Sequence, residues 1–309
     1  AVVFVGYAGQ FGWKYGLAST WIGLGNAAIG SLLAWVILGR RTRVMSQHLQ
    51  SKTMPDFFEK RYDSKGLKIA ASFIVFIFLI PYTASLYNGL SSLFNNVFAI
   101  PYWAVVVIMA VLTGVYVIFG GLRGVMYTDA LQGSIMVVAM LFLLVFIYWL
   151  LGGVSNANMA LTNMVNLYPA DAIATGGTGW TSFPTMGTPF WWSLVSSTLI
   201  GVGIGVLAQP SLIVRFMTVK SDKELNRSVL IGGIFIAIMP TTAYIVGALS
   251  NVYFHQNLGK IAVDVVGGNI DKIMISIAEV SMIQIRPVSD LRNKFPEVEK
   301  AVACGEPVY

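Results

Sequence analysis

The residues best suited to chemistry in this sequence are one carboxylate and two glycine-rich stretches that interrupt apolar runs. Asp129 stands at the start of such a run, where an ionisable side chain is costly and often functional. The stretches 5–12 and 200–210 each hold three glycines, and the second ends in Gln209-Pro210. Freed backbone groups are tolerated within a membrane where they line a cavity. The pattern predicts binding of a small solute or a cation.

The sequence shows no cluster of side chains suited to catalysis or metal binding. An enzyme in the membrane would need acids, histidines or cysteines grouped near one membrane depth. His48 and His255, the two histidines, lie far apart in polar segments, and Cys304 is the only cysteine. An intrachain disulfide and a cysteine-based metal site are therefore excluded. We expect a protein that is not an enzyme.

The composition predicts that long helices place these residues inside a lipid bilayer. Of the 309 residues, 56% are hydrophobic and 11% are charged, and the mean hydropathy is +0.72. A soluble domain carries about 25% charged residues. Residues 69–122, 130–170 and 172–214 contain no Lys, Arg, Asp or Glu, and about 20 helical residues cross a hydrocarbon core. The fold class predicted is an all-α polytopic membrane protein.

The apolar runs predict a partial span at residues 1–13 and six full spans. Residue 1 already lies in an apolar run with no basic leader, so we expect no signal peptide and a chain that begins within an element. Periodicity and length place the six full spans at 16–38, 69–96, 102–119, 129–151, 190–213 and 229–252.

Basic residues predict the orientation of these spans. The loops 39–68, 120–128 and 214–228 carry 13 Lys and Arg, whereas the alternate loops carry three. Because Lys and Arg accumulate on the cytoplasmic side, we expect these three loops in the cytoplasm and the loop 152–189 outside a bacterial inner membrane. The net charge of +6 follows from the same rule, so we expect no nucleic-acid partner for the membrane part.

The glycine-rich stretches have two interpretations. Small residues allow helices to pack closely without any ligand. Transporters, in contrast, build midplane sites from two discontinuous helices in inverted repeats. Gln209-Pro210 after the third glycine favours the second interpretation, so we expect the segment 190–219 to be broken near 201–205.

Asp129 also has two interpretations. It is either an N-terminal residue favoured by the helix dipole and paired with Arg123, or a functional carboxylate within the membrane. The residues Tyr116 to Gly133 around it predict a sharp turn between two spans. The physics of the residues alone leaves both open.

Three motifs of the sequence, in the order of one protein family, carry a resemblance. Gly120-Gly121-Leu122-Arg123, followed by Tyr127-Thr128-Asp129 and Gln132, is similar to the signature of the sodium/solute symporter family. Residues 53–62 resemble its cytoplasmic Thr-Leu-Pro-Asp-Phe motif. Ala208-Gln209-Pro210, followed by Arg215-Phe216-Met217, is similar to a stretch of sodium/proline symporters, and sodium/pantothenate symporters are similar as well. The resemblance covers residues 1 to about 274.

This resemblance implies the inverted-repeat fold of the leucine-transporter type, of which the sequence would be a fragment. Na⁺ would be the coupling ion, with no organic cofactor, and a small organic solute would cross the bilayer by alternating access. Asp129 would be the carboxylate of cation coupling. The solute-binding residues would be Ala1, Gly6, Thr20, Val202, Val206, Gln209 and Pro210.

Departures from the family pattern limit these implications. Proline symporters carry aromatic residues where Val202 and Val206 stand, which argues against proline as the solute. The main sodium site of the family lies between the inward half of the first broken helix and a later span. Neither segment is in this sequence, so we expect the fragment alone to be inactive.

The polar tail has a resemblance of its own. We expect a symporter domain over 1–274 and an unrelated tail over 275–309. From Met282 the tail resembles the N-terminus of a prevent-host-death type antitoxin, with a short strand, a helix capped by Ser289 and a second strand. A periplasmic loop is the alternative, and the tail is too short to predict DNA or toxin binding.

A symporter-like membrane sensor of a signalling protein is the alternative function. A sensor predicts a histidine-kinase or receiver domain after the spans. Such a domain is not recognisable within the 309 residues.

Overall fold

A computed structural model describes residues 8–98, 100–207, 209–219, 221–274 and 276–277. All regular structure in these residues is helical, and they contain no strand. Of the α+β tail predicted for 275–309, only 276–277 are described, and the predicted site residues Ala1 and Gly6 lie outside the described residues.

Within the described ranges, six helical stretches are long and apolar enough to cross a membrane. Each overlaps one of the six expected spans, which confirms the all-α polytopic class. The stretches are Gln10–His48, Lys65–Ser91, Tyr102–Gly121, Gly124–Leu150, Pro189–Thr218 and Asp222–Leu258.

The basic segment 39–68, expected as a loop, is largely helical. The first span continues through its arginines to His48, because arginine is a good helix former even where hydropathy ends a span. Thr53 then caps a second helix, its hydroxyl accepting a hydrogen bond from the Asp56 amide at 3.3 Å. The elements in order are α1 (Ala8–Tyr15), the 3₁₀ turn η2 (Gly16–Ser19), α2 (Thr20–Gly25), the π-helical η3 (Asn26–Leu32) and η4 (Ala34–Gly39), α3 (Arg40–His48) and α4 (Met54–Tyr62).

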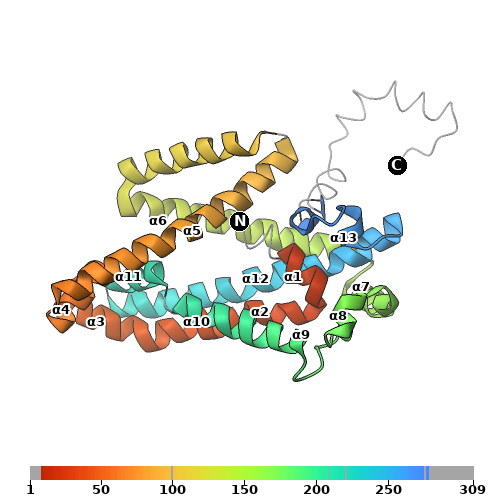
Figure 1. Ribbon diagram of the computed structural model, residues 1–309, viewed down its shortest axis with the longest axis horizontal. Helices are drawn as coiled ribbons and strands as arrows, with labels where there is room; N and C mark the ends of the chain where they lie inside the picture. The colour runs from red at the N-terminus through yellow and green to blue at the C-terminus, as the bar shows by residue number, and fades with distance from the viewer. Residues whose placement is uncertain (1–7, 99, 208, 220, 275, 278–309) are drawn as a thin grey trace.

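Two spans form an arm that leaves the bundle. Helix α5 (Lys65–Phe98) leads into α6 (Tyr102–Leu150), and Figure 1 shows α6 doubling back on itself. The turn is at Gly121, whose φ of +53° and ψ of −160° suit glycine alone. The sharp turn predicted around Gly120-Gly121 is therefore present. The half of α6 that follows Gly121 returns to the bundle.

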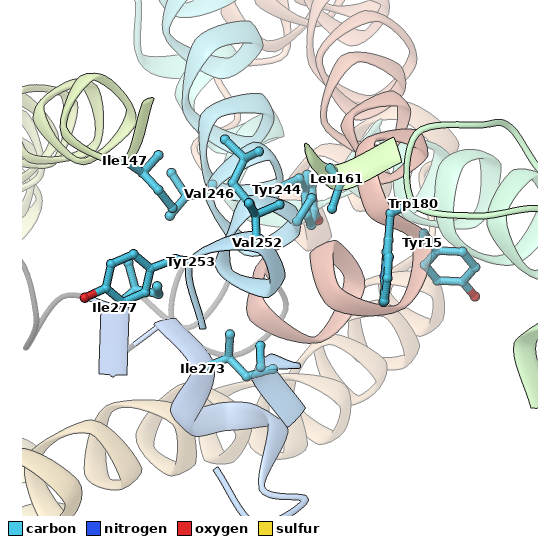
Figure 2. Close-up of a cluster of buried hydrophobic side chains, with 14 of the residues drawn as sticks. Tyr15, Ile147, Leu161, Trp180, Tyr244, Val246, Val252, Tyr253, Ile273 and Ile277 are labelled. Atoms are coloured by element: carbon cyan, nitrogen blue, oxygen red, sulfur yellow. The ribbon is translucent and has the colours of Figure 1, made fainter. Parts of the chain in front are cut away.

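Helix α12 (Asp222–Leu258) is the central element of the core. Its C-terminal half is almost wholly buried, and Figure 2 shows Tyr244, Val246 and Val252 of this half among side chains of other helices. Helix α1 crosses it so closely that a Cβ atom at Gly12 would lie 2.7 Å from the Ala248 amide nitrogen. For Gly12, the small-residue packing interpretation therefore applies.

The segment 152–189, expected as an external loop, contains two short helices and donates two hydrogen bonds to the C-terminal end of α1. The two helices are α7 (Val154–Asn163) and α8 (Ala170–Ala174). The indole N–H of Trp180 donates to the Trp13 carbonyl at 2.6 Å, and the Tyr168 hydroxyl donates to the Lys14 carbonyl at 2.8 Å. Burial, with smaller contributions from Tyr15 and Asp171, raises the pKa of Tyr168. We call these contacts the outer clamp.

Beyond α12 the described chain is short and irregular. It contains α13 (Ala262–Val265) and the 3₁₀ turn η7 (Ile270–Lys272). Ile273, which follows η7, is fully buried in the same core as the end of α12. The segment after the last long helix therefore packs back onto the bundle.

Candidate functional site

The fifth span is broken at Gln209, immediately before Pro210, and not near Gly201–Gly205 as expected. It runs as α9 (Pro189–Trp192), the π-helical η6 (Ser193–Ile200) and α10 (Gly201–Leu207), and resumes as α11 (Pro210–Thr218). Each glycine lowers helix propensity by only about 1 kcal/mol. Pro210, in contrast, sterically drives the residue before it out of the helical region, and Gln209 is extended, with φ −65° and ψ 123°.

The glycines of α10 divide between the two interpretations. Gly203 is buried, and a Cβ atom there would lie 3.2 Å from the Ile29 Cβ; a Cβ at Gly30 would lie 3.0 Å from the Gly203 carbonyl oxygen. These two glycines let α10 and η3 approach closely. Around Gly205 nothing lies within 4 Å of such an atom, so its missing side chain leaves open space.

That open space belongs to a groove beside the helix break, which we call the break groove. It has a volume of about 630 Å³, within the range of small-ligand sites. It brings together the four residues of this span that were predicted to bind solute. The lining consists of Asn26 of η3, the α5 residues Ile74, Val75, Phe78, Leu79 and Tyr82, and Val202, Gly205, Val206, Gln209 and Pro210.

The polar side chains of the break groove come from η3, from α5 and from the break itself. The Gln209 amide Nε2 donates to the Tyr82 hydroxyl at 3.3 Å, linking the break to α5. The Asn26 Oδ1 is buried and has no hydrogen-bond partner in the described part of the chain. Leaving a buried acceptor unpaired costs about 1–3 kcal/mol.

Sequence reasoning missed Asn26 and Tyr82. A usable signal existed for Asn26, since it is a single amide within the apolar span 16–38. Tyr82 carries no comparable signal. Thr20, which was predicted to bind solute, is not among the lining residues; its hydroxyl donates to the Leu17 carbonyl at 2.7 Å.

Asp129 is paired, and its partner is Arg215. The Asp129 Oδ2 accepts a hydrogen bond from the Arg215 Nη2 at 2.9 Å, and about half of each side chain is exposed. The pair joins α6 to α11, the helix that begins at the break. Arg215 also borders a cavity of about 610 Å³ whose lining includes Trp35 and Glu224. The ion pair therefore lies beside open space and next to the segment that the break makes irregular.

The described residues hold no group of three or more His, Cys, Asp or Glu side chains that could bind a metal ion. Asp129 is the one predicted cation-coupling residue, and its carboxylate is engaged with Arg215. Hard cations bind to oxygen ligands, so a cation at this position would have to displace the guanidinium group.

Curated relatives of the chain are transporters. It is 30% identical over 247 residues to the sodium/pantothenate symporter of Haemophilus influenzae, a match covering 80% of this chain and 48% of the relative. It is 28% identical to the osmoregulated proline transporter OpuE of Bacillus subtilis, over 78% of this chain and 46% of that protein. It is 30% identical to the sodium/proline symporter of Haemophilus influenzae, again over 78% and 46%.

The chain thus spans about half the length of the curated relatives it matches. No solved structure matches it significantly. Nothing in these comparisons supports the resemblance of the tail to an antitoxin. The model of the sodium:solute symporter family matches residues 1–282, past the expected limit at Met274. Since that match covers most of the 309 residues, the chain belongs to the sodium:solute symporter family.

Proposed function

We propose that the protein imports a small organic solute by sodium-coupled symport, with the break groove as part of its solute site. The observation that carries this proposal is the composition of the groove. Val202, Val206, Gln209 and Pro210 line it at a point where the helix is interrupted. Interrupted helices are where transporters of inverted-repeat architecture bind their solutes.

The break groove favours a solute with a carboxylate and an apolar body. The first turn of α11 carries the positive end of the helix dipole, while its Leu212 and Ile213 amides donate to the Gln209 carbonyl at 3.1 and 3.2 Å. Val202, Val206 and the α5 side chains form an apolar wall. Pantothenate and proline, the solutes for which the relatives are named, are both carboxylates. The valines favour a solute other than proline, because proline symporters carry aromatic residues at their positions.

The ion pair of Asp129 and Arg215 could couple solute binding in the break groove to cation binding at Asp129. Arg215 lies on α11, so a rearrangement of the break on solute binding would move Arg215 relative to α6. An exposed ion pair is worth only about 0–1 kcal/mol, and such a pair is easily exchanged for a cation. We propose that Asp129 alternates between Arg215 and Na⁺ during the cycle.

Uptake measured in liposomes tests the proposal. The complete protein should accumulate labelled pantothenate, or another carboxylate from a panel, only when an inward sodium gradient is present. Val202→Trp should fill the break groove and abolish uptake. Val138→Trp is the matched control, since Val138 lies on α6 outside the groove and is 69% exposed. Uptake without sodium would refute the coupling, and full uptake by Val202→Trp would refute the site.

A further inference from the structure

A second groove, separate from the break groove, lies at the basic end of the first span. It has a volume of about 700 Å³, and we call it the cationic groove. Its lining combines apolar side chains with three arginines and a histidine. The lining consists of Arg40, Arg41, Val44, Met45, His48, Leu49 and Arg61.

The cationic groove continues an exposed apolar face of the same helix. Leu33, Val36 and Ile37 are 41%, 68% and 44% exposed. Arg40 and Arg41 follow them one turn later, since residues three and four apart share a helix face. A turn advances the helix by about 5.4 Å. An anion bound at these arginines would therefore sit one turn beyond a surface that suits acyl chains.

Not all cations in this region are available to a ligand. Arg43 is buried, donates to the Val219 carbonyl at 3.0 Å and pairs with Asp222. Arg40 lies 3.8 Å from the same carboxylate. Arg41 and Arg61, in contrast, make no ion pair with any described residue.

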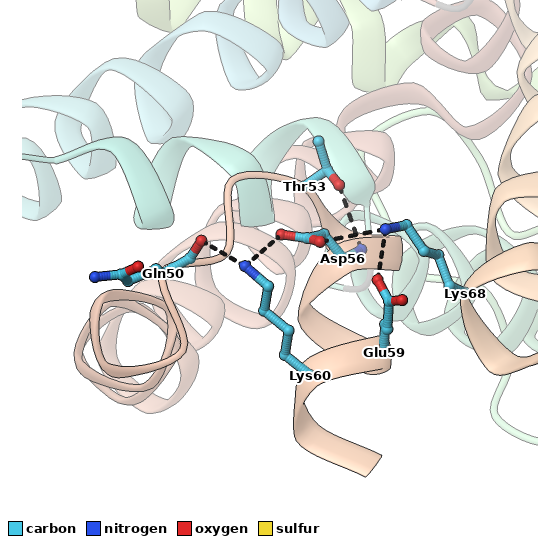
Figure 3. A network of polar contacts seen from close by, with 6 residues as sticks. All are labelled: Gln50, Thr53, Asp56, Glu59, Lys60 and Lys68. Carbon is cyan, nitrogen blue, oxygen red and sulfur yellow. Dashed lines mark hydrogen bonds and ion pairs between the residues drawn. The ribbon is translucent and has the colours of Figure 1, made fainter. Parts of the chain in front are cut away.

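The nearby carboxylates of α4 are already neutralised. Figure 3 shows Asp56 and Glu59 engaged with Lys60 and Lys68. The Lys60 ammonium also donates to the Gln50 carbonyl at 2.8 Å. This network fixes α4 beside the start of α5 and uses its acidic groups, so the positive charge of Arg61 is left for a ligand.

We infer that the cationic groove binds the phosphodiester headgroup of an anionic phospholipid of the leaflet that this end of the span contacts. The arginines and His48 supply donors for phosphate oxygens, and the apolar lining residues together with the face of Leu33, Val36 and Ile37 supply the surface for the acyl chains. Basic pockets at the cytoplasmic side of membrane helices recognise such headgroups. A free phosphate ion would use the arginines and leave the apolar lining residues without a partner. The inference does not depend on which solute is transported.

Native mass spectrometry of the complete protein in detergent tests this inference. The protein is titrated with phosphatidylglycerol and, separately, with phosphatidylcholine of the same acyl chains. We expect tighter binding of phosphatidylglycerol. A cation near an anionic lipid surface contributes roughly a fivefold factor in affinity, so Arg41→Gln/Arg61→Gln should weaken binding by roughly 25-fold.

Lys52→Gln/Lys65→Gln is the matched control, because it removes the same charge from exposed residues of the same region that do not line the groove. It should leave phosphatidylglycerol binding within about twofold of the wild type. Equal weakening by both double variants, or equal binding of the two lipids, would overturn the inference. Displacement of the lipid by millimolar inorganic phosphate would show a free-anion site and would overturn it as well. Unchanged helical circular dichroism confirms that the variants are folded.

Discussion

Replacing Gly12 by alanine is expected to separate α1 from α12 and to destabilise the protein. The new Cβ atom would lie 2.7 Å from the Ala248 nitrogen and from the Gly247 carbonyl carbon. Both are backbone atoms of a buried helix, so no side chain can rotate away. The two helices must therefore move apart by several tenths of an ångström.

The magnitude follows from two opposing effects. Overpacking of a core costs about 1–3 kcal/mol, and a widened gap also weakens dispersion contacts along the interface, which includes the Phe11–Tyr244 ring contact at 6.4 Å. Alanine instead of glycine in a helix contributes about 1 kcal/mol in favour of folding. We expect a net loss of about 1–2 kcal/mol for Gly12→Ala.

Gly114→Ala is the matched variant, because it makes the same substitution within α6 where nothing lies within 4 Å of the new atom. It should gain up to about 1 kcal/mol. The assay is unfolding of the purified protein by sodium dodecyl sulfate in mild detergent, followed by tryptophan fluorescence. Equal stability of the two variants would refute the close packing of α1 on α12.

Three further predictions concern the ion pair, the topology and the network of α4. Asp129→Asn should weaken the sodium dependence of uptake while membrane levels stay nearly normal, since its pair with Arg215 is half exposed; an equal fall of protein and uptake would indicate a structural role. With Cys304 replaced, an impermeant thiol reagent added to intact cells should label Thr178→Cys and spare Lys52→Cys; both positions are exposed, and the reverse result would invert the topology. Burial tends to raise the pKa of Asp56, but the ion pairs with Lys60 and Lys68 outweigh it and lower this pKa. Its stabilising contribution should therefore be present above about pH 3.9 and be lost as the pH falls further through the lowered value. Hydrogen exchange of the α4 amides, corrected for intrinsic rates, should accelerate in the wild type as the pH falls below about 3.9. Asp56→Asn should not show this acceleration.

The sequence predicts the spans well because hydropathy and length are local properties. It places the ends of helices less well, since the arginines of α3 are polar and yet helical. The position of the helix break depends on whether proline or glycine interrupts the helix more strongly. Pro210 acts on its immediate neighbour whatever the surroundings, whereas the effect of Gly203 depends on whether another helix packs against it, and η3 does.

The site is only partly predictable for a related reason. The motif around Gln209-Pro210 identifies one wall of the break groove. Asn26 and Tyr82 reach it from other helices, and no local pattern reports which helices become neighbours. Arg215 is likewise 86 residues from Asp129 in the sequence. Pairings at such separations follow from tertiary packing, which a single sequence does not reveal.

The hydrogen bonds of the outer clamp allow substitution at most positions of the end of α1 and the following turn, but not at Gly16. Trp13 and Lys14 contribute only carbonyl oxygens to Trp180 and Tyr168, and Leu17 contributes only its amide, which donates to the Trp180 carbonyl at 2.7 Å. Every residue type has a carbonyl and every residue but proline has an amide, so these hydrogen bonds survive most side-chain changes at the turn. Gly16 is the exception, because its φ is +59° and a Cβ atom would lie 2.0 Å from the Trp180 oxygen. The hydrogen bonds of the outer clamp therefore constrain side-chain identity at Gly16 and not at Trp13, Lys14 or Leu17, while the side chains that donate to the end of α1, Tyr168 and Trp180, lie more than 150 residues downstream.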